Sequence, residues 1–213
     1  MKQLFTALCL VLLLCTSCGP RIYQSASFES VTRTHKKVAI LPALVTINLR
    51  PNEARKTTPE LLEKNEAATG YALQERMYGW FLRRSNRFNY TVDFQDVSQT
   101  NNLLEKAGIS YADLHRKSKD EVARLLGVDA VITPSLRTDK PMNEGVAVAV
   151  GIVFGVWGNT NQAFTTINIH EAKNADLIWK YDYQASGSVG SSPDNLINAL
   201  MRNASRKFPY NGK

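Results

Sequence analysis

The sequence lacks the features that mark several common classes of protein. In its 213 residues no apolar run reaches the roughly 20 residues that a membrane-spanning helix requires. It contains no internal repeat and no low-complexity segment. With 44% hydrophobic and 21% charged residues, 12 Gly and 8 Pro, the composition is that of an ordinary globular protein. A helical membrane protein, a fibrous protein and a disordered chain are therefore disfavoured, and one folded domain is expected.

Motifs for common enzymatic chemistries are also missing. There is no HExxH, and the three histidines, His35, His115 and His170, are scattered, which argues against a zinc site. The Gly-x-Ser-x-Gly elbow, the P-loop and the GxGxxG motif are absent. Asp93 and Asp96 are an alternative, a carboxylate pair for glycoside cleavage, but no other feature of the sequence supports this hypothesis. We predict a protein that is not an enzyme, with no metal and no cofactor.

The N-terminus resembles the signal of a bacterial lipoprotein. After a short positive start, residues 4–15 (LFTALCLVLLLC) form an apolar stretch of signal-peptide length. Small residues then precede Cys18, as in the lipobox, in which the cysteine receives a diacylglyceryl group and the peptide before it is removed. The match departs from the family at Cys15, where a Leu is usual. Ordinary secretory cleavage with an unmodified Cys18 is the alternative.

Lipidation at Cys18 has consequences for the rest of the chain. Cleavage removes Cys9 and Cys15, which leaves one cysteine and excludes an intramolecular disulfide. Residues 19–35 are polar and rich in Ser and Thr, and we interpret them as a tether. Gly19, not Asp, follows the cysteine, which in Gram-negative lipoproteins implies the outer membrane. We expect a signal peptide over residues 1–17, an anchor and tether over 18–35, and a single domain over 36–213 that faces the periplasm.

Hydrophobic patterns predict strands that alternate with helices. The apolar run 36–42 is typical of a buried strand, and Thr58-Pro59-Glu60 is a helix start. Further strands are expected at 90–95, 128–133, 164–170 and 177–183, and further helices at 98–106, 118–127 and from residue 192. This order indicates an α/β fold, a mixed sheet of about five strands flanked by helices.

The long helix from Thr58 is expected to run to Arg84. Gly70 weakens this helix by about 1 kcal/mol relative to Ala. Apolar residues at three- and four-residue steps predict the face that packs on the sheet. These are Leu61, Ala68, Tyr71, Tyr78 and Leu82.

Three segments carry a resemblance to known proteins: KKVAILP at 36–42, EVARLLGVDAVITPSL at 121–136, and INIHEAKNADLIWKYDY at 167–183. They are similar to lipoproteins related to the amino-terminal domain of TolB and to the curli-export lipoprotein CsgG. The resemblance implies the same α/β fold and a role in envelope assembly, binding or secretion. It brings no catalytic residues, because these families have none to transfer.

The stretch 146–157 (VAVAVGIVFGVW) is the most unusual part of the chain. As a strand it can pair with 164–169 through a turn at 158–161; as a helix it has small residues along one side. It is expected to be either a buried central strand or a segment that contacts membrane or other copies. The candidate contact residues are Val146, Val148, Val150, Gly151, Ile152, Phe154, Gly155 and Trp157.

Two predicted helix ends are basic. Cations at a helix C-terminus are stabilised by the helix dipole, so a structural role suffices for them. The alternative is docking to anionic lipid or to cell-wall phosphates. Nucleic acid is disfavoured by the location and by the lack of a recognised motif. The candidate anion contacts are Arg83, Arg84 and Arg87 in one helix and Arg202, Arg206 and Lys207 in the other.

Two further segments have simple structural explanations. The aromatic row Trp179, Tyr181 and Tyr183 on one strand face is expected to pack under a helix. The Gly- and Ser-rich segment 187–192 is expected to be a flexible turn rather than an anion cradle.

Together these patterns predict a non-catalytic, lipid-anchored outer-membrane lipoprotein. It would serve as a binding or assembly component of the cell envelope, with an envelope protein as partner or with self-association. The alternative is an oligomeric secretion-pore or membrane-contacting subunit of the CsgG kind. A cell-wall hydrolase is a third hypothesis, with less support from the sequence.

Overall fold

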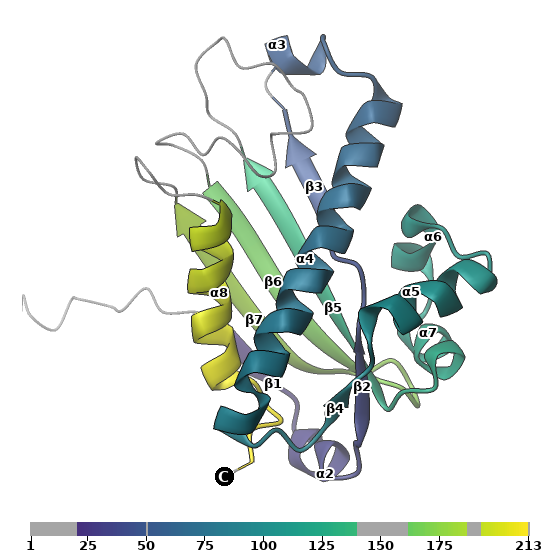
Figure 1. Ribbon diagram of the computed structural model, residues 1–213, viewed down its shortest axis with the longest axis vertical. Coiled ribbons are helices and arrows are strands. Elements are labelled where there is room, and N and C mark those ends of the chain that lie inside the picture. Colours follow the sequence, from purple (N-terminus) through teal and green to yellow (C-terminus); the bar gives the residue numbers. More distant parts are fainter. Residues whose placement is uncertain (1–20, 50, 140–161, 187–192, 213) are drawn as a thin grey trace, which may run out of the picture.

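The computed structural model describes residues 21–49, 51–139, 162–186 and 193–212 (Figure 1). The strands are β1 (Arg21–Gln24), β2 (Lys37–Ile40), β3 (Leu44–Asn48), β4 (Asp93–Phe94), β5 (Ala130–Asp139), β6 (Gln162–Glu171) and β7 (Leu177–Ser186). The helices are α2 (Phe28–Thr32), α3 (Pro51–Ala54), α4 (Pro59–Phe88), α5 (Val97–Lys106), α6 (Tyr111–Arg116), α7 (Lys119–Leu126) and α8 (Pro193–Lys207).

The strands form one mixed sheet, which confirms the predicted α/β class. Its order is β1-β7-β6-β5-β2-β4, and β3 pairs with β5 beyond the end of β2. The pairs β2–β4, β2–β5 and β3–β5 are parallel, and the pairs β5–β6, β6–β7 and β1–β7 are antiparallel. Within the described residues the sheet has seven strands instead of about five, because β1 and β3 lie in segments expected to be tether and loop.

Helices cover both faces of the sheet, which therefore has two cores. Val38 and Ile40 of β2 point toward α4 and α8, whereas Ala39 and Leu41 point toward α5, α6 and α7. All four side chains are at most 2% exposed. A strand buried on both faces has a continuous apolar sequence, as was predicted for 36–42.

The ends of α4 and α7 follow the local sequence. Thr58 caps α4 with a hydroxyl that accepts a hydrogen bond from the Leu61 N–H at 3.3 Å. Asn89 ends α4 in the left-handed conformation (φ 47°), and Gly127 ends α7 in the same way (φ 65°).

The face of α4 that packs on the sheet is not the predicted one. Leu61, Tyr71 and Leu82 are 39%, 39% and 46% exposed. The buried side chains of α4 are instead those of Thr69, Leu73, Gln74, Met77 and Phe81, with Gly70 beside them. The helix carries apolar residues at helical steps on both faces, and the buried face combines Leu73, Met77 and Phe81 with paired polar residues. The Gln74 side-chain amide donates to the Ile40 carbonyl oxygen at 2.7 Å and also bonds with Asn101.

Residues 21–35 belong to the fold, contrary to the interpretation of 19–35 as a tether. Strand β1 pairs with β7, and α2 buries Phe28 in the core. His35 is 5% exposed, and its Nδ1 lies 2.7 Å from the Tyr210 hydroxyl. The polar composition of this segment reflects an edge strand and a short surface helix, neither of which needs a strong hydrophobic pattern.

The predicted hairpin between 146–157 and 164–169 is wrong. Strand β6 pairs with β5 on one side and with β7 on the other, over nearly its full length. A strand that is paired on both sides has no edge left for a further partner. Residues 146–157 themselves lie outside the described residues, in the connection between Asp139 and Gln162, which are register partners.

All three histidines have lowered pKa values. Burial is the main cause for His35, His115 and His170, and the pKa of His115 falls from 6.5 to about 4, with the nearby Lys119 adding to the effect. The unfolded chain therefore binds more protons than the folded protein as the pH falls below 6.5. The contribution of these neutral side chains to stability is complete above that pH and is lost toward pH 4.

We accordingly expect acid to destabilise the fold before its carboxylates titrate. The free energy of unfolding from urea titrations should fall by on the order of 1–2 kcal/mol between about pH 7 and pH 5. The change is modest because His115 and His170 are only half-buried. His115→Gln should reduce this slope. A stability that stays flat over this interval would contradict the prediction.

Candidate anion-binding site between α4 and α8

Helices α4 and α8 run side by side over one face of the sheet (Figure 1). Their contact includes a hydrogen bond in which the Trp80 indole N–H of α4 donates to the Asn198 side-chain oxygen of α8 at 3.1 Å. This bond fixes the orientation of the indole ring at the junction of the two helices. Trp80 is partly buried at the margin of the core.

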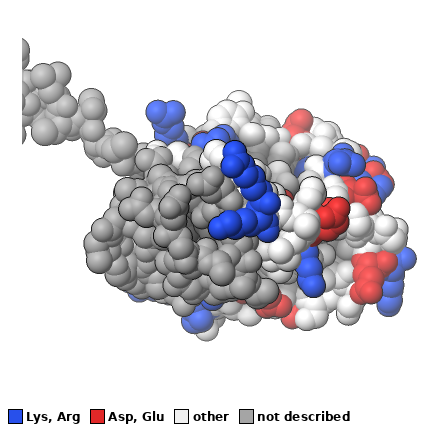
Figure 2. Space-filling model, turned by 90° about the horizontal axis from the view of Figure 1, so that it is seen from above, with Lys and Arg blue, Asp and Glu red and all other residues white. Residues whose placement is uncertain are grey.

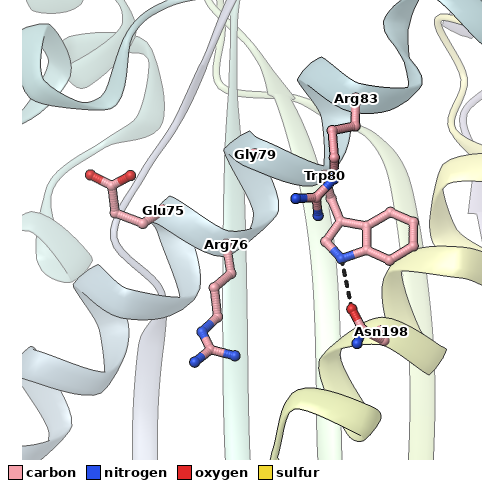
Figure 3. Close-up of a pocket in the computed structure, with 6 residues that line it drawn as sticks. All are labelled: Glu75, Arg76, Gly79, Trp80, Arg83 and Asn198. Carbon is pink, nitrogen blue, oxygen red and sulfur yellow. Dashed lines mark hydrogen bonds between the residues drawn. The ribbon is translucent and has the colours of Figure 1, made fainter.

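A surface pocket of about 330 Å³ lies at this junction. Gly79 lines this pocket and leaves space in it, because a Cβ added at Gly79 would meet no atom within 4 Å. In the close-up the Glu75 carboxylate points away from the indole (Figure 3). The residues that line the pocket are Glu75, Arg76, Gly79, Trp80, Arg83 and Asn198.

Arginines surround the indole. The guanidinium carbons of Arg83 and Arg84 lie 5.3 and 5.0 Å from the centre of the Trp80 ring, within the range of cation–π attraction. Neither arginine forms an ion pair with a residue in the part of the chain that the structure describes. A guanidinium group offers several N–H donors in one plane, an arrangement suited to carboxylate or phosphate.

The structure brings the two predicted basic helix ends onto neighbouring helices. Arg83 lines the pocket, Arg84 contacts its indole, and Arg87 lies one turn further along α4, over the Phe88 ring at 5.8 Å. Arg202, Arg206 and Lys207 are exposed on α8, C-terminal to Asn198. These three residues are therefore on the helix that contributes Asn198 to the pocket, but they do not line the pocket themselves.

Of the lining residues, the sequence analysis identified Arg83 and missed Glu75, Arg76, Gly79, Trp80 and Asn198. Residues 76, 79, 80 and 83 follow the three- and four-residue spacing of one helix face, so the α4 part of the site was visible as a pattern. No sequence signal connects this face with Asn198, because their contact depends on how α8 packs.

Charge alone does not single out the site. On the face seen from above, several basic side chains lie beside acidic ones, so a long-range field of one sign is not evident there (Figure 2). The case for anion binding rests instead on the local combination of a hollow, an oriented indole and guanidinium groups.

The other candidate residues have structural roles or lie elsewhere. Asp96 caps α5, its Oδ1 accepting from the N–H groups of Ser98 and Gln99 at 2.8 and 3.2 Å. Asp93 lies in β4, where it is the register partner of Lys37 in β2. No group of three His, Cys, Asp or Glu suited to a metal occurs among the described residues.

No helix within the described ranges is long and apolar enough to cross a membrane.

The aromatic row of β7 is core, as predicted. Trp179 and Tyr181 are 1% and 0% exposed, and their rings stack at 5.9 Å. Tyr183 is half-buried and continues the stack. Cys18, the segment 146–157 and the turn 187–192 lie outside the described residues, so their predicted roles stay predictions.

Comparison with known proteins finds likeness in structure alone. No family model and no curated protein matches the chain. Lipoprotein GNA1162 from Neisseria meningitidis is 12% identical, with a TM-score of 0.43, and the match covers 80% of this chain and 94% of that one. The PelC dodecamer from Paraburkholderia phytofirmans is 10% identical, with a TM-score of 0.44 and coverage of 92% and 98%. The LpoB C-terminal domain from Salmonella enterica is 14% identical, with a TM-score of 0.35 and coverage of 74% and 93%. These are distant likenesses, so what this chain binds has to be inferred from its own residues.

Proposed function

We propose that this protein is a non-catalytic lipoprotein of the outer membrane, anchored at Cys18 and facing the periplasm, which binds an anionic group of an envelope partner between α4 and α8. The observation that carries the binding role is the Trp80 indole, held by Asn198 and overlain by Arg83 and Arg84, beside the space at Gly79. The lipobox-like sequence before Cys18 supports the anchor.

The chemistry of the pocket favours recognition of phosphate. Guanidinium groups bind phosphate oxygens through paired N–H donors, and the flat indole provides apolar contact next to them. Trp and Arg together are also the residues that dominate the energy of binding surfaces. A phosphate in the envelope can come from a lipid headgroup or from a soluble polymer, and the two sources can be separated by experiment.

The binding role is tested by charge reversal in the pocket. We expect Arg83→Glu/Arg84→Glu to weaken binding to at least one of two probes, polyphosphate or phosphatidylglycerol vesicles, by about tenfold or more, because it replaces both donors with like charges. Lys106→Glu/Arg116→Glu, an equal change of charge at exposed sites on α5 and α6, should alter binding less than about twofold. Equal losses in the two double variants, or no binding of either probe by the wild type, would refute the site.

The anchor is tested separately by labelling cells with radioactive palmitate. Cys18→Ser should abolish the label and release the protein from the membrane fraction, since one lipid-modified cysteine holds the mature chain there. Cys15→Ser should keep both the label and the location, because Cys15 belongs to the removed peptide. Label that survives in Cys18→Ser would show that the anchor was assigned wrongly.

A pore or membrane-contacting subunit is the second candidate function. It is favoured by one observation: the 22 residues that connect the paired ends of β5 and β6, from 140 to 161, contain the apolar stretch 146–157. Hairpin connections are usually two to five residues long, and longer ones are often functional. Gly151→Glu/Gly155→Glu should then disrupt oligomers, measured by light scattering. A variant with the same mass and membrane behaviour as the wild type would exclude the pore.

A further inference from the structure

Strand β1 is an exposed edge of the sheet with two large apolar side chains. Among the described strands it pairs with β7 alone, and all four of its residues are exposed. Ile22 is 44% and Tyr23 51% exposed. Because neighbouring residues of a strand point to opposite faces, Ile22 and Tyr23 flank the free edge on its two sides.

The free edge lies very close in the chain to the proposed lipid. Only two residues separate Cys18 from Arg21, where β1 begins. Three Cα steps of at most about 3.8 Å place the Arg21 Cα within roughly 11 Å of the Cα of Cys18. The interfacial layer of a bilayer, beyond the hydrocarbon, is about 5–10 Å deep. An anchor at Cys18 therefore keeps the start of β1 within about 11 Å of the anchored residue, close enough to reach the headgroups.

The side chains at this edge suit a lipid surface. Tyrosine is enriched at membrane interfaces, where its ring is apolar and its hydroxyl meets water. Arg21 is exposed, and Lys180 lies opposite Tyr23 on the same sheet face. Arg21 has a long apolar stem and a head suited to headgroup phosphates, whereas the Lys180 ammonium already pairs with the Asp182 carboxylate at 3.0 Å. The unpaired backbone groups of the edge can be satisfied by headgroups and water.

We propose that β1 lies edge-on in the headgroup layer of the membrane that holds the lipid, with Ile22 and Tyr23 inserted into the interface. The domain is then docked on the membrane in a defined orientation instead of moving freely at the end of a tether. This inference rests on the proposed lipidation of Cys18 and adds a second contact to it.

The mature chain is well suited to a test by spin labelling. Cys18 carries the lipid, so a cysteine introduced elsewhere is the only free thiol. Ile22→Cys and Tyr23→Cys are to be labelled in the full lipidated protein in phosphatidylethanolamine–phosphatidylglycerol vesicles. Leu125→Cys is the matched control, since Leu125 is 39% exposed and lies on α7, on the opposite side of the fold from β1 (Figure 1).

We expect the labels at 22 and 23 to be at least several-fold less accessible to water-soluble nickel chelate, and more accessible to oxygen, than the label at 125. The docking is refuted, and the anchor stands, if the labels at 22 and 23 are as accessible to nickel chelate as the label at 125 while the protein still floats with the vesicles and carries palmitate. If the protein neither floats nor carries palmitate, the anchor itself is wrong. Protection of 22 and 23 that persists in a soluble dimer of the Cys18→Ser form would assign the edge to a second copy and overturn the proposal.

Discussion

Gly70→Ala is expected to destabilise the protein by at least about 2 kcal/mol, although alanine is the better helix former. An added Cβ at this point of α4 would collide with the Ala43 carbonyl oxygen and come within 2.8 Å of the Tyr111 ring. The Ala43 backbone cannot retreat easily, because its N–H donates to the Gly70 carbonyl oxygen at 3.1 Å and its oxygen accepts from the Tyr111 hydroxyl at 2.7 Å. Overpacking against such a fixed backbone costs about 1–3 kcal/mol or more.

Gly79→Ala provides the matched control on the same helix. No atom lies within 4 Å of the Cβ that it adds, so only the helix propensity changes, and stability should rise by about 0.5–1 kcal/mol. Urea unfolding of the two variants measures the contrast. Equal effects of the two substitutions would show that α4 does not approach the β2–β3 connection as closely as described.

Phe81→Ala is expected to cost about 3–5 kcal/mol, the value for removing a large buried aromatic side chain. Phe81 is 0% exposed, and its ring centre lies 5.0 Å from that of Phe94 and 4.5 Å from that of Phe208. It thereby joins α4 to β4 and to the segment that follows α8. The loss of its ring leaves a cavity that these neighbours, each held by its own backbone, cannot fill.

Phe88→Ala, at the end of the same helix, is the comparison for this effect. Phe88 is only half-buried and stacks on Tyr90 at 6.0 Å, so we expect a loss below about 1.5 kcal/mol. Thermal unfolding followed by circular dichroism distinguishes the two variants. A loss from Phe81→Ala no larger than that from Phe88→Ala would contradict the described core.

The elements that could be predicted from sequence are those whose signals are local. The Thr58 cap, the left-handed Gly127 and the apolar run 36–42 each depend on a few neighbouring residues, and each lies where it was expected. Strand β3 was missed although its residues alternate between exposed and buried, because Pro42 was interpreted as the end of the preceding strand and the start of a loop. Strand β1 was missed because all of its side chains are exposed.

The candidate site also combines residues that local sequence predicts with one that only the packing of distant helices brings in. Arg83, Arg84 and Arg87 were identified from the sequence because they cluster at a helix end. Their relation to Trp80 follows from helix spacing, which was not used. Asn198, more than a hundred residues away, joins them only because α8 packs beside α4.

By itself the sequence determined the lipobox-like start, the α/β class and the positions of most helices and strands, since composition and periodicity act over a few residues. Only the tertiary structure decided which of two apolar faces of α4 is buried, because the choice depends on partners in other elements, such as Asn101 of α5 for Gln74. It alone decided that residues 21–35 belong to the domain, and that β6 has partners on both sides. Those outcomes depend on contacts between distant parts of the chain, which no local pattern records.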